Sequence, residues 1–272
     1  MSTKPGGGAL LYRMLDDAAM FPPGNASAET AIREHLRHRQ SWYRDLVGPL
    51  LVHFARWQEL GEASARSGSP ALDVVVLDPA PAGPPALAGI TVVGYEQAAT
   101  DPLGLPLDAP TAVELVDPEQ YTAELTGVAA ARLSGAEVIA KYRTGGVVPE
   151  AFPSEATVAR VIAAAVRLDV PLKFTAGLHG ALRHTDAGAG LERHGFLNLM
   201  AAVHLAQQGG DEGEIEAVVA LRDRDEVAAR VRAWSDDEVA QVRRGFRSFG
   251  CCGVEDPIAD AVALHLVAPV PA

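Results

Sequence analysis

Short apolar runs alternate with amphipathic segments along nearly the whole chain of 272 residues. Several of these runs, such as Asp73–Leu77, are apolar without alternation, which is typical of parallel strands that are covered on both faces. We therefore predict eight strands, at Leu10–Leu15, Leu50–Phe54, Asp73–Leu77, Ile90–Gly94, Ala112–Val116, Val138–Tyr142, Leu172–Thr175 and Arg247–Gly250.

The segments between the apolar runs carry signals for helix starts. Ser154 follows Pro153 and precedes an apolar stripe with helical spacing, and Ser27 opens a second segment of this kind. The connection from Pro79 to Gly89 is rich in proline and glycine and has no room for a full helix. Three further helices are predicted at Arg193–Gln208, Glu214–Leu221 and Asp236–Arg244.

Eight strands with intervening helices indicate an α/β protein, and in particular a (β/α)8 TIM barrel of the aldolase type. We find no internal repeat and no domain boundary, so we predict a single barrel domain over residues 1–272. Residues 178–246 hold the three later helices, and we expect this stretch to be a helical insertion before the last strand.

Composition limits the possible partners and the compartment. With 48% hydrophobic and 21% charged residues the chain can bury a large core, and a net charge of −12 argues against nucleic acid as a partner. The longest apolar runs are too short to cross a membrane, and the N-terminus lacks the pattern of a signal peptide. The adjacent Cys251 and Cys252 cannot link distant segments, which favours the reducing cytoplasm. The sequence leaves assembly into a homo-oligomer open.

Lysine is rare in this chain, with three residues against twenty arginines. Lys4 lies in the Gly-rich N-terminal segment, whereas Lys141 and Lys173 each follow a short apolar run and precede a Gly-rich turn. An amine can lose its proton and attack a carbonyl group, but a guanidinium group stays charged. The two lysines therefore suggest covalent carbonyl chemistry. The alternatives are that they bind an anion or form a structural ion pair.

In a barrel of this kind, side chains at the carboxyl ends of the strands face the active site. Asp16 and Asp17 are adjacent, so they face opposite sides of a strand; we favour Asp16 for the site and expect Asp17 at the surface or as a cap. His35 and His38 lie among arginines on a helix and are predicted to be solvated. The other carboxylates near strand ends are Asp78, Glu96, Glu114 and Asp117.

The order of these motifs resembles the class I deoxyribose-phosphate aldolase family. The Lys141-Tyr-Arg-Thr-Gly-Gly segment is similar to the family's sixth-strand Lys-Thr-Ser-Thr-Gly, whose lysine forms a Schiff base. The Lys173-Phe-Thr-Ala-Gly-Leu segment is similar to its seventh-strand Lys-x-x-Gly-Gly-Ile, whose lysine tunes the first. The opening at Leu15–Pro22 and the turn at Phe249–Gly253 resemble the family's first-strand motif and its phosphate-binding turn. Some of these segments also resemble a group of uncharacterised bacterial proteins.

The sequence departs from the family pattern at three places. The family has an aspartate on its fourth strand that takes part in a proton relay, but residues 89–94 are apolar and Glu96 lies beyond them. The hydroxyls of the eighth-strand turn are replaced by Cys251 and Cys252. The segment after Lys173 adds polar residues that the family lacks, namely His179, Arg183, His184 and His194.

Together these features predict a lyase that forms a Schiff base between Lys141 and a small anionic carbonyl substrate. Lys173 would favour the free amine of Lys141, and Asp16 or Glu114 would move protons. No cofactor is predicted, and no metal, because the histidine spacing matches no standard zinc pattern. The alternatives are enolate chemistry with the lysines as charge stabilisers, and an inactive binding barrel. The predicted substrate-binding residues are Arg143, Thr144, Thr175, His179, Arg183, Ser248, Gly250 and Cys251.

Overall fold

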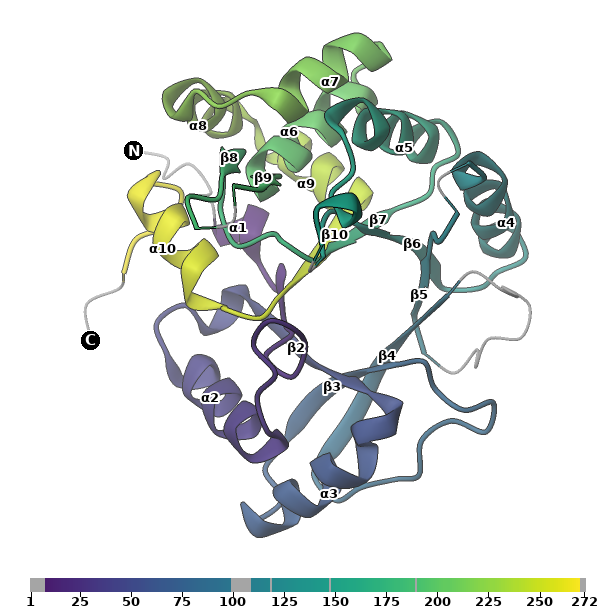
Figure 1. The fold of residues 1–272 in the computed structure, drawn as a ribbon, viewed down its shortest axis with the longest axis vertical. Helices are drawn as coiled ribbons and strands as arrows, with labels where there is room; N and C mark the ends of the chain where they lie inside the picture. Colours follow the sequence, from purple (N-terminus) through teal and green to yellow (C-terminus); the bar gives the residue numbers. More distant parts are fainter. Residues whose placement is uncertain (1–7, 99–108, 118, 147, 189, 270–272) are drawn as a thin grey trace.

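Eight parallel strands close into a barrel, in the order β1, β10, β7, β6, β5, β4, β3, β2 (Figure 1). The structure, a computed structural model, describes residues 8–98, 109–117, 119–146, 148–188 and 190–269, so Lys4 lies outside the described residues. The barrel strands are β1 Leu15–Asp17, β2 Val47–His53, β3 Leu72–Leu77, β4 Ile90–Ala98, β5 Thr111–Glu114, β6 Val138–Arg143, β7 Leu172–Thr175 and β10 Phe246–Cys251. The predicted α/β class and TIM barrel are confirmed.

Helices surround the barrel, as Figure 1 shows. Their bounds are α1 Gly8–Leu11, α2 Ala28–Gln40, α3 Trp57–Arg66, α4 Tyr121–Leu133, α5 Glu155–Arg167, α6 Phe196–Gln207, α7 Glu212–Ala220, α8 Arg224–Ala233, α9 Asp236–Gly245 and α10 Glu255–Ala263. Single 3-10 turns lie at Arg44–Leu46, Phe54–Arg56 and Pro149–Ala151. The predicted caps are confirmed, because Ser27 and Ser154 each accept a hydrogen bond from a backbone N–H of the first helical turn.

The prediction for the first strand is wrong over most of its length. The chain forms the short helix α1 and a turn before β1, which begins only at Leu15. Leu10 and Leu11 are both buried in the main apolar cluster, so their apolar character reflects the packing of a short helix and not a strand. Arg13 then adopts a positive φ of 47°, which an extended strand does not allow.

The segment between β7 and β10 contains α6, α7, α8 and α9, as the predicted insertion required. It also contains a two-stranded antiparallel ribbon of β8, His184–Thr185, and β9, Glu192–Arg193, so α6 starts after Arg193 and not at it. The helix α8 was not predicted. In contrast, the connection from β3 to β4 holds no helix, as its proline and glycine content indicated.

The apolar core lies between the strands and the surrounding helices. Phe174 and Phe249 project outward from β7 and β10 and are fully buried, and Phe249 stacks on Phe196 of α6 with ring centroids 5.1 Å apart. With these apolar residues outside, the neighbouring positions Lys173 and Ser248 face the barrel interior, since side chains alternate along a strand. The fold therefore places polar side chains in the centre of the barrel.

Candidate active site

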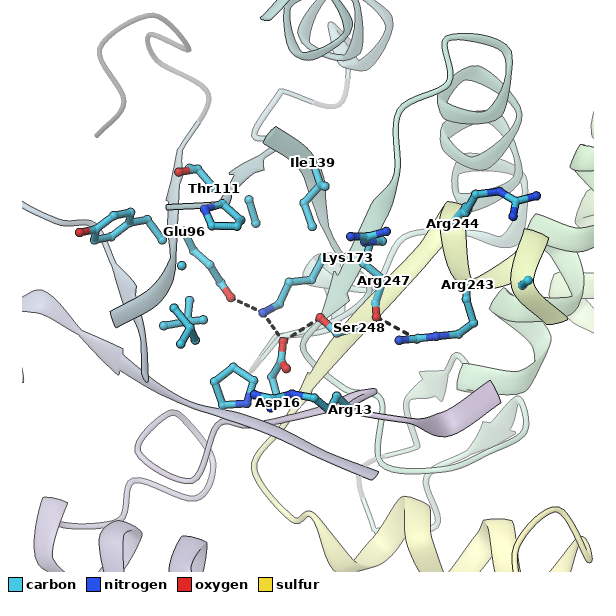
Figure 2. A pocket seen from close by; sticks show the side chains of 18 residues that line it. Arg13, Asp16, Glu96, Thr111, Ile139, Lys173, Arg243, Arg244, Arg247 and Ser248 are labelled. Carbon is cyan, nitrogen blue, oxygen red and sulfur yellow. Dashed lines mark hydrogen bonds and ion pairs between the residues drawn. The ribbon is translucent and has the colours of Figure 1, made fainter. Parts of the chain in front are cut away.

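Five charged side chains from five strands form one continuous ion-pair network inside the barrel, which we call the buried charge chain: Asp16, Lys173, Glu96, Lys141 and Glu114. The Lys173 Nζ atom lies 2.5 Å from Asp16 Oδ2 and 2.5 Å from Glu96 Oε1. The Lys141 Nζ atom lies 2.7 Å from Glu96 Oε2 and 2.7 Å from Glu114 Oε2. Glu96 thus bridges the two lysines. Figure 2 shows Lys173 between Glu96 and Asp16.

The register of the strands brings most residues of the buried charge chain together. Glu114 pairs with Lys141, and Lys141 pairs with Lys173, on the neighbouring strands β5, β6 and β7. Paired residues in a parallel sheet point to the same side, so all three face the interior. On β10, Ser248 is paired with Lys173, and its hydroxyl donates to Asp16 Oδ2 at 2.7 Å. The predicted proximity of the two lysines follows directly from this register.

Glu96 is the main residue whose role the sequence did not predict. The strand was expected to end at Gly94, but β4 continues to Ala98 and includes Glu96. The register between β3 and β4 shifts, because Val74 pairs with Val92 whereas the next residue, Val75, pairs with Gly94. This bulge reverses the alternation and turns Glu96 inward. The fourth strand therefore does supply an acid to the site.

The pKa values of the residues in the buried charge chain are set by burial and by the excess of carboxylates over lysines. Burial raises the pKa of Asp16, although Lys173 and Ser248 oppose the shift. Burial would also raise the pKa of Glu96, but Lys173 and Lys141 together lower it to about 2. The pKa of Lys173 is raised by Asp16 and Glu96 despite the opposing effect of burial. Lys173 thus remains an ammonium, and of these groups Asp16 is the carboxyl that takes up a proton most readily.

The buried charge chain reaches the carboxyl ends of the strands at Glu114. The side chain of Lys141 is only 4% exposed, whereas that of Glu114 is 21% exposed and that of Arg143 is 50% exposed. Arg143 Nη1 lies 3.9 Å from Glu114 Oε1. Exposure therefore increases from Lys141 outward, toward the face where active sites of TIM barrels lie.

The other end of the buried charge chain lines a cavity of about 710 Å³. Thr111 and Ile139 are the first and second residues of their strands, so this cavity lies at the amino ends of the strands. Arg13, Arg243, Arg244 and Arg247 line one side of it, and Asp16, Lys173 and Glu96 form its inner wall (Figure 2). The buried charge chain thus runs from this cavity to the opposite face of the barrel.

Gly48 on β2 makes room for Asp16. A Cβ atom at position 48 would overlap Asp16 Oδ1. We expect Gly48→Ala to displace the Asp16 carboxylate and to lower the free energy of unfolding by about 1–3 kcal/mol, as measured by chemical denaturation. Gly8→Ala is the control, because a Cβ atom there meets nothing within 4 Å. Equal stability of the two variants would show that the contact between Gly48 and Asp16 is unimportant.

Three of the predicted substrate-binding residues lie close to the buried charge chain, namely Thr144, Thr175 and Gly250. The Thr144 hydroxyl donates to the backbone oxygens of Thr175 and Ala176, at 3.1 and 2.8 Å, and so joins the segment after β6 to the carboxyl end of β7. Thr175 and Gly250 are also neighbours, since a Cβ atom at Gly250 would lie 3.2 Å from Thr175 Oγ1. His179 and Cys251 lie together, with Nδ1 and Sγ 3.7 Å apart.

Arg183 is not brought to the buried charge chain. Its guanidinium lies 2.5 Å from Glu155 and 3.2 Å from Glu192, and it is also 3.3 Å from His194 Nδ1. His194 Nε2 in turn lies 2.8 Å from the backbone oxygen of Pro153. These contacts of the buried Arg183 and His194 connect the ribbon to the start of α5.

Asp17, His35 and His38 are buried, so the predictions of a surface aspartate and of solvated histidines are wrong. Asp17 does act as a local cap, because it accepts a hydrogen bond from the Ala19 N–H at 3.0 Å. Its second oxygen lies 2.9 Å from His35 Nδ1. The histidine face of α2 packs toward the barrel, whereas Arg33 and Arg37 of this helix are exposed.

No protein-family model matches the chain, and no curated protein matches it either. In the part of the chain that the structure describes, no helix is both long enough and apolar enough to cross a membrane. Within the same residues, no group of three or more His, Cys, Asp or Glu side chains is arranged to hold a metal ion. A functional assignment therefore rests on the geometry of the site.

Proposed function

We propose that the protein is a cytoplasmic lyase that forms a Schiff base between Lys141 and a small anionic carbonyl compound. The observation that carries this proposal is the buried charge chain, in which a shielded amine lies between two carboxylates and next to a second ammonium group. Such an arrangement supplies a nucleophile together with groups that accept and return its protons. The half-exposed Arg143 would bind the anionic end of the substrate.

In the proposed reaction, Glu114 accepts a proton from Lys141, and the free amine attacks the carbonyl carbon. The nitrogen gives up a proton as the carbonyl oxygen gains one, which yields a carbinolamine. Glu114 then returns its proton to the hydroxyl oxygen, and water leaves as the lone pair of the nitrogen forms the iminium. The iminium then accepts the electron pair of the carbon–carbon bond that breaks, while Glu114 takes the hydroxyl proton of the fragment that leaves as a carbonyl compound. Asp16 can replace protons through Lys173 and Glu96, because these groups are in direct contact with one another.

A second candidate is enolate chemistry without a covalent step. Each lysine is bound by two carboxylates, and the raised pKa of Lys173 keeps that amine charged. Two fixed ammonium groups would stabilise an enolate that forms above them, and Glu114 would move the proton. This candidate requires no free amine.

Reduction with borohydride separates the two candidates. We expect a substrate-dependent mass increase on the Lys141 peptide in the presence of small aldehydes, ketones or 2-keto acids, and no increase in Lys141→Met. Lys141→Arg is the matched control, since it keeps the positive charge but cannot form an imine. Turnover of a carbonyl substrate without any adduct would favour the enolate candidate. Absence of both adduct and turnover over a broad panel would leave the inactive binding barrel.

A further inference from the structure

A second group of reactive side chains lies at the carboxyl ends of β7 and β10, outside the buried charge chain. Cys252 directly follows β10, His179 lies in the segment after β7, and Asp256 is in the first turn of α10. Cys252 Sγ lies 3.3 Å from His179 Nε2, and His179 Nδ1 lies 2.9 Å from Asp256 Oδ2. A thiol, an imidazole and a carboxylate thus stand in the order nucleophile, base and orienting group.

The environment of these groups favours a thiolate and an imidazolium. Hydrogen bonds with Cys251 and Cys252 raise the pKa of His179 to about 11, although burial opposes this. Burial also opposes ionisation of Cys252, yet hydrogen bonds and charge attraction from His179 lower the pKa of this thiol, and the backbone N–H of Gly24 adds to the effect.

Cys251 provides an internal comparison. This residue is only 2% exposed, burial raises the pKa of its thiol, and its Sγ donates to the backbone oxygen of Gly253 at 3.2 Å. Two adjacent cysteines therefore have opposite character, and only Cys252 has the properties of a nucleophile.

Cys252 is also reachable from outside. A separate cavity of about 230 Å³ is lined by Cys252, Asp256 and Gly253 together with residues of α2. The charged and titratable groups on its wall are Asp17, Glu34, Arg37, His38, Glu255 and Asp256. This volume is sufficient for a compound of a few carbon atoms.

We propose that Cys252 is a second nucleophilic centre, which binds small aldehydes covalently with His179 as its acid–base partner and Asp256 as the orienting group. The thiolate sulfur forms a bond to the carbonyl carbon while the π bond of the carbonyl opens. The resulting alkoxide takes the proton of the His179 imidazolium, and the reverse transfer releases the aldehyde. No oxidant or further reactant is needed. The proposal does not depend on the Lys141 reaction.

Limited alkylation with iodoacetamide, read by peptide mass, tests the nucleophile. At about pH 6 an ordinary thiol is almost entirely protonated, so we expect Cys252 to react at least about tenfold faster than Cys251. His179→Gln should slow the reaction of Cys252 by about tenfold at this pH, and the difference should shrink near pH 9.5, where an unassisted thiol also ionises. A Cys252 rate that rises with pH like that of a free thiol and is unchanged in His179→Gln would overturn the proposal.

Protection of Cys252 from alkylation tests whether this residue binds aldehydes. In Lys141→Met, which cannot form the imine, acetaldehyde or glycolaldehyde should slow alkylation of Cys252 reversibly, and dilution should restore the rate. Asp256→Asn should weaken this protection while the protein stays folded, as judged by circular dichroism. Fast alkylation without protection by any small aldehyde would show that the thiolate does not bind them. Protection in Lys141→Met, even where borohydride finds no lysine adduct, would support this site on its own.

Discussion

Replacing Glu96 by glutamine is expected to lower the free energy of unfolding by about 3–5 kcal/mol. The carboxylate of Glu96 is the only group of the buried charge chain that contacts both lysines, at 2.5 and 2.7 Å. Glutamine keeps the shape of the side chain but removes the charge and turns an amide N–H₂ group toward an ammonium. Lys173 would then keep only the carboxylate of Asp16, and Lys141 only that of Glu114. Thermal and chemical denaturation measure the loss, and we expect the melting temperature to fall by roughly 10 °C.

Glu114→Gln is the matched control, because Glu114 contacts the same lysine at the same distance but is partly exposed. Water can replace part of the lost interaction there, so this substitution should cost about 1 kcal/mol or less. If the two variants were equally stable, the bridging position of Glu96 would not be important for the fold.

The same variant should also change the response to acid. The pKa of Glu96 is lowered from 4.5 to about 2, so its contribution is fully present above about pH 4.5 and is lost as the pH falls toward 2. Over this interval the pKa shift of Glu96 corresponds to about 3 kcal/mol of folding stability. Glu96→Gln should therefore show a flatter decline of stability between these pH values than the unaltered protein.

The sequence predicted the barrel because its strands are apolar runs bounded by turn residues, and that pattern does not depend on distant contacts. It also predicted that Lys141 and Lys173 belong together, since consecutive strands of a parallel barrel are neighbours. Both lysines proved to be paired across β6 and β7. The proximity of these residues could therefore be predicted wherever local pattern and barrel order were sufficient.

Glu96 shows where this reasoning stops. Ile90 and Val92 pack against the apolar residues outside the barrel, such as Leu72 and Val74 of β3. Simple alternation from them would place residue 96 outside the barrel as well. Only the bulge opposite Val74 and Val75 turns it inward, and a bulge depends on pairing with another strand. The burial of His35 similarly depends on Asp17, which lies 18 positions away on β1. Such features require the tertiary structure.

The final prediction concerns the inner end of the charge chain. Lys173→Met is expected to destabilise the protein by about 3–5 kcal/mol near pH 8, because Asp16 and Glu96 both lose the ammonium that lies 2.5 Å from each of them. In the unaltered protein the pKa of Lys173 is raised, so its contribution is present at neutral pH and is lost only in strong alkali.

The pH dependence of this variant should have the opposite sign to that expected for Glu96. Two buried carboxylates without a cation between them hold a proton more tightly than in the unfolded chain, so the variant gains stability as the pH falls from 8 toward 5. Urea denaturation at several pH values measures this slope. The double variant Asp16→Asn/Lys173→Met removes one of the two carboxylates and should recover part of the stability at pH 8 and reduce the slope. If the double variant were no more stable than Lys173→Met, repulsion between Asp16 and Glu96 would not be the cause, and lost packing around the lysine side chain would explain the effect instead.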